Sequence, residues 1–348
     1  TVAHPGTGTA QKGLLDALTG IRTRGSTNLS GGWLQGRALV HERHLAEGVN
    51  RVILLTDGLA NVGITDGETL TRLAAEARRA GVSTTTVGVG ADFDEDLLAA
   101  MADAGGGSAY YIERLDQAGG IFEEEVAGLL SIGAQNLTVT IRPRDAVSVA
   151  TVHHGYPAEN AGDGRLRVAV GDLYAREPRE LLADFLVPDG VLAGEGAGSR
   201  GPADGSSAFP VADLVVEADV WSPDGSVERR RISLALTFSP EEGAVSHPEV
   251  ERVFLLLQAA RARREAVERG DRGDVAGSVR ALRASAVQLQ DLADTDLTAR
   301  EEMRDLYKLA ESMEDDTELS PMDRKYMRAK SQHYSRGRRS AGDRTSRD

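Results

Sequence analysis

The strongest constraint on the fold is one short apolar run, RVILLTDG, at residues 51–58. Its five consecutive apolar or β-branched residues are followed by Asp57 and Gly58, which end the run. Continuous apolar runs of this length, bounded by turn residues, are typical of strands that are buried on both faces, as in parallel sheets. The run therefore predicts a buried parallel strand.

Segments on both sides of this run alternate between helical and extended patterns. Thr65 to Glu68 form a Thr-x-x-Glu pattern that predicts a capping box, and Gly81 has the position of a C-cap glycine. The expected helices cover 11–19, 32–47, 68–80, 94–107 and 121–131, and the expected strands cover 51–56, 82–90 and 108–112. This alternation predicts a doubly wound α/β sheet.

From about residue 134 the apolar period changes to two. Strands are expected within 136–143, 147–152, 165–173, 179–188, 213–225 and 229–239. Short strands at regular spacing predict an antiparallel β-sandwich, and the Gly/Ser/Ala-rich stretch 192–208 predicts an exposed, mobile loop. Helical periodicity returns near 248–269, 274–292 and 298–313, where AVERGDRGDVAGSVRAL resembles a helical hairpin.

These changes of pattern predict four segments along the chain. They are an α/β domain at 1–131, a β-sandwich at 132–240, a helical segment at 241–316 and a basic tail at 317–348. The tail is expected to be disordered, because Ser, Gly and Arg dominate it and little in it can be buried. The opening TVAHPGTGTAQKG has no signal-peptide pattern, and the expectation is a chain that starts late in its domain.

Composition excludes several classes of function. The chain has no cysteine, so thiolate metal sites and disulfide scaffolds are excluded. The formal net charge is −14, and residues 324–348 hold nine Lys or Arg against two Asp. The acidic body argues against nucleic-acid binding, and no apolar run is long enough for a membrane span. Cytoplasm is weakly favoured as the compartment of the given residues, and high Ala, Arg and Gly content is typical of GC-rich bacteria.

Polar side chains gather in two loops that should lie at the carboxyl edge of the sheet, where open α/β sheets bind ligands. Ser26, Thr27, Asn28 and Ser30 are in the first loop, and Thr56, Asp57 and Asn61 are in the second. Hydroxyl and carboxylate oxygens are the ligands that a hard cation such as Mg²⁺ prefers. Asp57 alone is more typical of a turn or a cap than of a metal ligand. Ser26 and Asn28 are possible supporting groups of such a site, but they are more typical of loop and cap residues than of ligands.

The motifs GSTNL and LLTDG, followed by GVSTTTVGVGADFDEDLLAAMADAGGGSAYYI, resemble the second half of a von Willebrand factor A domain. The resemblance implies a metal-ion-dependent adhesion site in which Thr27 and Asp57 are ligands of Mg²⁺, Ca²⁺ or Mn²⁺. A partner protein would complete the shell with an Asp or Glu carboxylate. Later segments such as GDLYAREPRELLADFLVP resemble bacterial relatives of inter-alpha-trypsin-inhibitor heavy chains and calcium-activated chloride channels.

The sequence also departs from that family, because Asp-x-Ser-x-Ser occurs nowhere in the 348 residues. Three of the family's five ligands would be missing, and the expectation is an N-terminally truncated domain with an incomplete cation site. The leading interpretation is a non-enzymatic protein-binding module. A metal-free interaction scaffold comes second, and a metal-dependent hydrolase third.

Other candidate sites are weaker. His41 and His44 are one residue short of the zincin spacing, so a solvated helix face is expected there. His153 and His154 are adjacent in an expected strand and should point to opposite faces. Leu59 occupies the position where a phosphatase Asp-x-Asp motif needs its second carboxylate. Without a second acid, the sequence predicts no enzyme.

Overall fold

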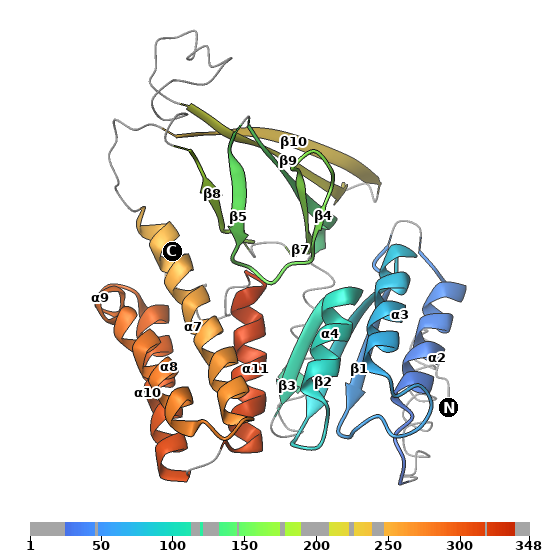
Figure 1. Ribbon diagram of the computed structural model, residues 1–348. Helices are drawn as coiled ribbons and strands as arrows, with labels where there is room; N and C mark the ends of the chain where they lie inside the picture. Colours follow the sequence, from blue (N-terminus) through green and yellow to red (C-terminus); the bar gives the residue numbers. More distant parts are fainter. Residues whose placement is uncertain are drawn as a thin grey trace.

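The computed structural model describes residues 25–45, 48–112, 119–120, 132–144, 146–174, 178–188, 209–222, 226–238, 247–316 and 319–337. They form an α/β part, an antiparallel β part and a set of C-terminal helices (Figure 1). The predicted fold class is confirmed, whereas the exact domain boundaries stay predictions. The expected helices at 11–19 and 121–131 and the expected loop at 192–208 lie outside the described residues.

A parallel sheet with strand order β1-β2-β3 forms the centre of the α/β part. The elements are β1 (Arg51–Thr56), β2 (Ser83–Val89), β3 (Gly106–Ile112), α2 (Leu29–Glu42), α3 (Gly67–Arg79) and α4 (Glu95–Gly105). Trp33 of α2, Leu70 of α3 and Met101 of α4 are fully buried in one apolar cluster with Val52 and Leu54 of β1. Buried and less buried residues alternate along β1, so one side of the strand faces the helices.

The two strands β1 and β2 differ in burial. β2 is the middle strand, and its residues Thr84 to Val89 are all buried. In β1, Leu55 points away from Val52 and Leu54 and is 44% exposed. The prediction that β1 is buried on both faces is therefore wrong at Leu55, because within the described residues β1 has β2 as its one strand neighbour.

Aspartate side chains begin two of the helices in the α/β part. The Asp66 carboxylate accepts a hydrogen bond from the Thr69 amide, and the Asp94 carboxylate accepts one from the Leu97 amide. Asp66 and Asp94 are therefore the N-caps of α3 and α4, and α3 begins after Asp66 and not with the predicted Thr65 capping box. Thr65 is not the cap, because the carboxylate of the neighbouring Asp66 is a stronger acceptor for helix N–H groups.

The β part consists of two facing antiparallel sheets. One has the order β10-β9-β4-β7-β6, and the other pairs β5 with β8. The strands are β4 (Ile132–Pro143), β5 (Ser148–Val152), β6 (Ala158–Asn160), β7 (Leu166–Tyr174), β8 (Ala183–Leu186), β9 (Phe209–Trp221) and β10 (Val227–Phe238). Ile141 and Val168 of the larger sheet share an apolar cluster with Val149 and Phe185 of the smaller one, which is the packing expected of a sandwich.

The two adjacent histidines lie just outside the predicted strand. β5 ends at Val152, and both His153 and His154 are buried in the segment that follows. His153 stacks edge-on against Phe254, whereas His154 stacks on Tyr156. The prediction that they alternate within a strand is therefore wrong, because the backbone leaves the ladder before reaching them.

The C-terminal helices confirm the predicted hairpin. They are α7 (Pro248–Gly270), α8 (Val275–Gln288), α9 (Gln290–Ala293) and α10 (Leu297–Asp316). The expected helix at 274–292 is divided between α8 and α9. Arg263 of α7 is fully buried and forms ion pairs with Glu302 and Asp305 of α10. Among the described helices, none is long and apolar enough to cross a bilayer.

The predicted disordered tail is wrong for residues 321–335, which form helix α11 (Pro321–Ser335). Ser320 caps this helix through its hydroxyl, and Pro321 occupies the first turn. Met327, Ser331 and Ser335 are buried against neighbouring elements. Residues 338–348 lie outside the described part of the chain.

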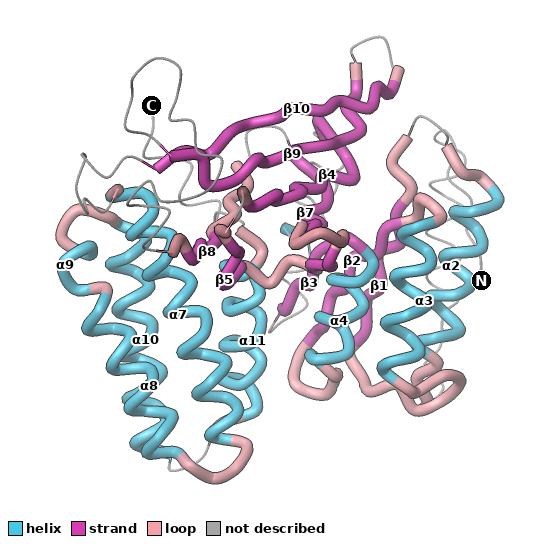
Figure 2. Tube along the Cα trace, turned by 45° about the horizontal axis from the view of Figure 1, so that its top comes forward, coloured by secondary structure: helices cyan, strands magenta, loops and turns pink. Residues whose placement is uncertain are grey.

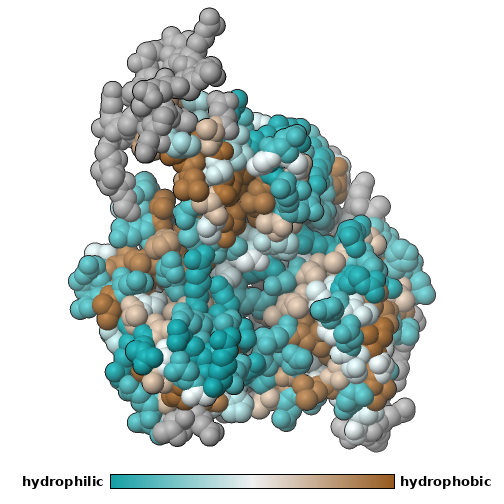
Figure 3. Space-filling model, in the orientation of Figure 1, coloured by the Kyte–Doolittle hydropathy of each residue, from teal (hydrophilic) through white to brown (hydrophobic). Residues whose placement is uncertain are grey.

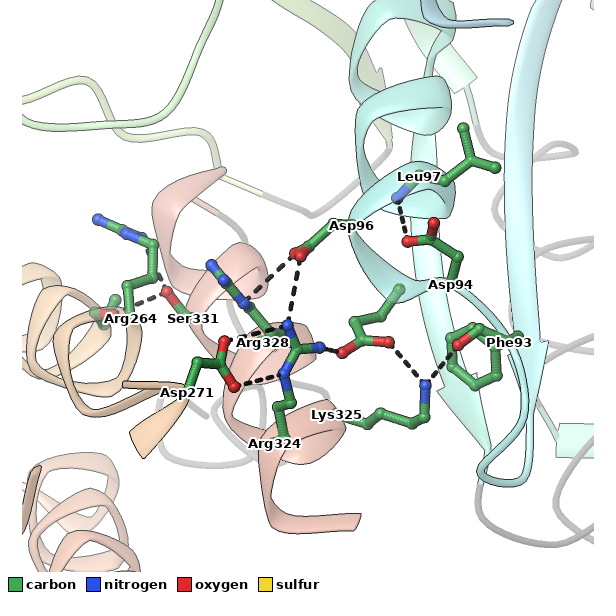
Figure 4. A network of polar contacts seen from close by, with 12 residues as sticks. Phe93, Asp94, Asp96, Leu97, Arg264, Asp271, Arg324, Lys325, Arg328 and Ser331 are labelled. Carbon is green, nitrogen blue, oxygen red and sulfur yellow. Dashed lines mark hydrogen bonds and ion pairs between the residues drawn. The ribbon is translucent and has the colours of Figure 1, made fainter. Parts of the chain in front are cut away.

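Cationic side chains attach α11 to α4, more than two hundred residues earlier in the sequence. Lys325 Nζ lies 2.6 Å from a Glu95 carboxylate oxygen and 4.0 Å from the Phe93 ring centroid. Arg328 Nε lies 3.3 Å from Asp96. Figure 4 shows Arg324, Lys325 and Arg328 pointing toward the first turn of α4. The composition of the tail could not indicate this order, because its acidic partners are distant in sequence.

Contacts between the three parts are specific. Arg51 at the start of β1 donates to Asp172 of β7 at 2.6 Å and to the Tyr174 hydroxyl at 2.8 Å. The Arg51 and Asp172 side chains are 2% and 10% exposed, so this ion pair is buried between the α/β part and the sandwich. Figure 2 shows α11 on the side of the helical part that faces β3 and α4. The α/β part therefore contacts both other parts.

Candidate functional site

The loop before α2 and the loop after β1 are joined by backbone hydrogen bonds. The Thr27 amide donates to Asn61 Oδ1 at 2.7 Å, and the amides of Asn61 and Val62 both donate to the Thr27 carbonyl at 3.2 Å. The two loops lie at the carboxyl end of the parallel strand β1, as the sequence predicts. This arrangement fixes Thr27 beside the segment that contains Asp57.

Gly58 brings the two loops into close contact. A Cβ atom at Gly58 would lie 3.1 Å from Thr27 Oγ1, so the Thr27 hydroxyl rests against the residue that follows Asp57. The Thr56 hydroxyl donates to the Gly58 carbonyl at 3.0 Å, which closes the turn after the strand. The structure therefore places Thr27 and Asp57 at the same end of the sheet.

Thr27 Oγ1 and the Asp57 carboxylate have no hydrogen-bond or ion-pair partner among the described residues. Asp57 is exposed and Thr27 is half-buried. Oxygen atoms of this kind, which lie at the same end of the sheet and have no partner in the described part of the protein, are able to bind a hard cation or a polar ligand. They also remain available for water.

The two residues predicted as supporting groups have different roles. The Asn28 side-chain oxygen accepts hydrogen bonds from the Gly31 amide at 2.8 Å and from the Ser30 hydroxyl at 3.2 Å, so Asn28 is the N-cap of α2. Ser26 is exposed, beside Gly25, which has a positive φ of 68°. Their alternative interpretation as cap and loop residues therefore has structural support, and a ligand role for either stays a prediction.

Sequence reasoning missed the importance of Gly63. This residue has a φ of 80°, and a Cβ atom there would lie 2.4 Å from Asn28 Oδ1 and 2.5 Å from Ser30 Oγ. The Ser30 hydroxyl in turn accepts a hydrogen bond from the Ile64 amide at 2.8 Å. A glycine between two polar loops was the available signal, since positive φ and close approach both favour glycine.

A comparison with protein families assigns this part of the chain. Residues 3–124 match the profile described as the von Willebrand factor type A domain. The chain contains a von Willebrand factor type A (VWA) domain. VWA domains are generally protein-interaction modules and commonly bind divalent metal ions. The predicted resemblance is thereby confirmed.

A relative from Escherichia coli, described as the uncharacterized protein YfbK, is 30% identical over 126 residues. The match covers 36% of this chain and 22% of YfbK, so the chain spans about a fifth of that relative. The similarity supports a bacterial VWA domain protein, as predicted from the composition and the motifs. It covers a length close to that of the VWA domain alone.

Two solved structures share the fold over most of this chain. A von Willebrand factor type A protein from Catenulispora acidiphila has a TM-score of 0.67 at 13% identity, covering 95% of this chain and 77% of that chain. The human COPII-coat protein Sec24c has a TM-score of 0.53 at 13% identity, covering 93% of this chain and 45% of that chain. The likeness therefore extends beyond the VWA domain to the sandwich and the helices.

The donor set of the VWA domain decides how well a metal ion fits. No group of three or more His, Asp or Glu side chains in the described ranges is placed to hold a metal ion. Thr27 and Asp57 provide two oxygen donors of the type that Mg²⁺ prefers. The described residues thus fit one side of a cation, and water would complete its shell.

Proposed function

We propose that this chain is a non-enzymatic protein-binding module that uses a divalent cation at Thr27 and Asp57. The observation that supports this proposal is that Thr27 Oγ1 and the Asp57 carboxylate lie at the same carboxyl edge of the sheet, without hydrogen-bond or ion-pair partners among the described residues. Mg²⁺, Ca²⁺ or Mn²⁺ would offer an open coordination position to an Asp or Glu carboxylate of a partner protein. VWA domains are generally protein-interaction modules, which supports a binding role for this one.

The residues around Asp57 support binding over catalysis. Asn28, Ser30 and Asn61 are engaged in hydrogen bonds that maintain the loops. Among the described residues, Asp57 belongs to no group of three or more His, Asp or Glu side chains, and hydrolysis would need a second acid or base beside it. A metal-dependent hydrolase is accordingly the weakest of the three functions.

Metal binding is tested by titrating the full chain with Mn²⁺ and measuring the free ion by electron paramagnetic resonance. Wild type is expected to bind one Mn²⁺ weakly, with a dissociation constant of about 10⁻⁴–10⁻³ M, because two protein donors hold it. Asp57→Asn and Thr27→Val should abolish this binding, because each removes one of the two donors.

Asp92→Asn is the matched control, since Asp92 is another exposed aspartate in a loop that follows a parallel strand. It should bind Mn²⁺ like wild type. Equal Mn²⁺ binding by wild type and Asp57→Asn, or none by wild type, would overturn the cation site in this chain. The metal-free interaction scaffold would then become the leading interpretation.

A further inference from the structure

A cavity of about 410 Å³ lies where the VWA domain, the sandwich and the C-terminal helices meet. It is lined by residues of α4, β3, α7 and α11 and by the segment that follows β5. The molecular surface is hollowed where these parts adjoin (Figure 3). Cavities of this volume at domain junctions are typical binding sites for small molecules.

Positive charge exceeds negative charge in the lining. Five cationic side chains and three carboxylates line the cavity. Each carboxylate already has a cationic partner. Glu95 pairs with Lys325 at 2.6 Å, Asp96 pairs with Arg328 at 3.3 Å, and Asp103 pairs with Arg336 at 2.5 Å.

The remaining two cations, Arg261 and Arg264, contact neutral groups. Arg264 donates to the hydroxyls of Ser331 and Ser335 at 2.7 and 2.6 Å, as Figure 4 shows for Ser331. Arg261 donates to His153 Nδ1 at 2.9 Å. Across the described residues, neither guanidinium has a carboxylate within the 4.0 Å of an ion pair.

These guanidiniums are held close to one another in a partly dehydrated site. Burial, followed by the charges of Arg261 and Arg328, lowers the pKa of Arg264, while Glu268 opposes this effect from a distance. Arginine nevertheless stays protonated in proteins. The cluster therefore has an electrostatic cost that an anion between the guanidiniums would offset.

The two histidines in the lining are neutral hydrogen-bonding groups. Because Arg261 can only donate, His153 Nδ1 must accept, which leaves the proton on Nε2 for the Asp184 carboxylate at 2.8 Å. Burial, with a smaller contribution from His153, lowers the pKa of His154 to about 4. The excess positive charge of the cavity thus comes from Arg261 and Arg264.

We propose that the cavity binds a small phosphate-bearing anion between Arg261, Arg264 and Arg328. Guanidinium groups bind phosphate oxygens in bidentate pairs, and the groups here come from two helices that converge on one space. The volume exceeds that of a single phosphate, which favours a phosphorylated small molecule. This site is separate from Thr27 and Asp57, so it does not depend on the proposed cation.

Because the cavity lies between separate parts of the chain, a bound ligand would affect how firmly these parts are held together. Arg261 and Arg264 belong to α7, Arg328 belongs to α11, and Asp96 of α4 faces Arg328 across the junction. A bound anion would link α7 to α11 and would strengthen the attachment of these helices to the VWA domain. Ligand binding should therefore raise the stability of the junction.

The test is calorimetric titration of the full chain with inorganic pyrophosphate at constant ionic strength. Wild type is expected to bind one pyrophosphate, and the double variant Arg261→Gln/Arg264→Gln should bind at least tenfold more weakly. Arg280→Gln removes one charge from an exposed position on α8 and should bind like wild type. A similar loss in Arg280→Gln would show a general charge effect and would overturn the site.

A second variant and a second ligand keep the test independent of folding. Arg264→Lys retains the positive charge but loses the planar guanidinium that can bind phosphate in a bidentate way. This variant should therefore bind pyrophosphate with intermediate affinity. Inorganic phosphate should bind more weakly than pyrophosphate, and citrate at equal charge should bind more weakly still. Equal affinity for citrate and pyrophosphate would overturn the preference for phosphate, and absence of pyrophosphate binding by wild type would overturn the site.

Discussion

His154 is a buried side chain whose protonation opposes folding. Its Nδ1 accepts a hydrogen bond from the Leu182 amide at 3.0 Å, and its ring stacks on Tyr156. A protonated ring would lose that acceptor and would add charge beside the arginines of the cavity. Burial therefore keeps His154 neutral in the folded chain.

This titration predicts a loss of stability in mild acid. The pKa of His154 is about 4 in the folded chain against 6.5 in a model peptide, so below pH 6.5 the unfolded chain binds a proton that the folded chain does not. The free energy of unfolding should fall between pH 6.5 and about 4 by at most about 3 kcal/mol.

His154→Asn should remove this contribution, because asparagine retains an acceptor but does not titrate. Urea denaturation at pH 7 and pH 4.5 measures the difference, with His41→Asn as a control at an exposed position in α2. An unchanged pH dependence in His154→Asn would show that other groups cause the acid sensitivity.

At the scale of elements, the buried charges of α7 and α10 tie two helices together. Arg263 and Glu302 are 0% and 1% exposed, and Lys330 of α11 approaches Glu302 and Asp305 at 3.0 and 2.9 Å. Burial opposes the charge of Arg263, yet Glu302 and Asp305 together raise its pKa. The network thus depends on each carboxylate.

Glu302→Gln should destabilise the chain by about 3–5 kcal/mol, because it leaves Arg263 buried with one fewer counter-charge. Glu314→Gln is the control, since Glu314 forms an exposed ion pair with Arg283 at 2.7 Å and should cost less than about 1 kcal/mol. Guanidinium chloride denaturation of both variants measures the two effects. Similar losses would contradict a special role of the buried pair.

Elements with strong local patterns were predictable from the sequence, and elements with distant partners were not. The parallel strands followed from apolar runs, and α7 and α8 followed from the helical periodicity near 248–269 and 274–292. Helix α11 was missed, because Lys325 and Arg328 become buried or paired only through Glu95 and Asp96 of α4. In the candidate site, Thr27 and Asp57 were identified by motif, whereas the role of Gly63 required the backbone angle.

At the scale of the whole molecule, α11 connects the last helical part to the VWA domain. The Lys325 side chain is 5% exposed and donates to the Phe93 carbonyl at 2.5 Å as well as to Glu95. Arg51 connects the same domain to the sandwich. The VWA domain is therefore fixed on two sides by charged contacts.

Lys325→Glu should detach α11 from α4, because it places a carboxylate against Glu95 in a buried position. Amide hydrogen exchange is expected to show a loss of protection of roughly 100-fold in α4 and α11, in line with about 3 kcal/mol for a broken buried pair. Amides of β9 should keep their protection. Lys308→Glu, at an exposed position of α10, is the control. Unchanged exchange in α4 would contradict this linking role.

The contact between α4 and α11 also has a consequence for synthesis. A ribosome completes α4 at Gly105, but α11 begins at Pro321, more than two hundred residues later. At a synthesis rate of about 5–20 residues per second, the surface of α4 that contacts α11 remains uncovered by it for about 10–40 s. During that interval the nascent VWA domain lacks its last neighbour, so translation speed and chaperone access would influence how much protein reaches the native state.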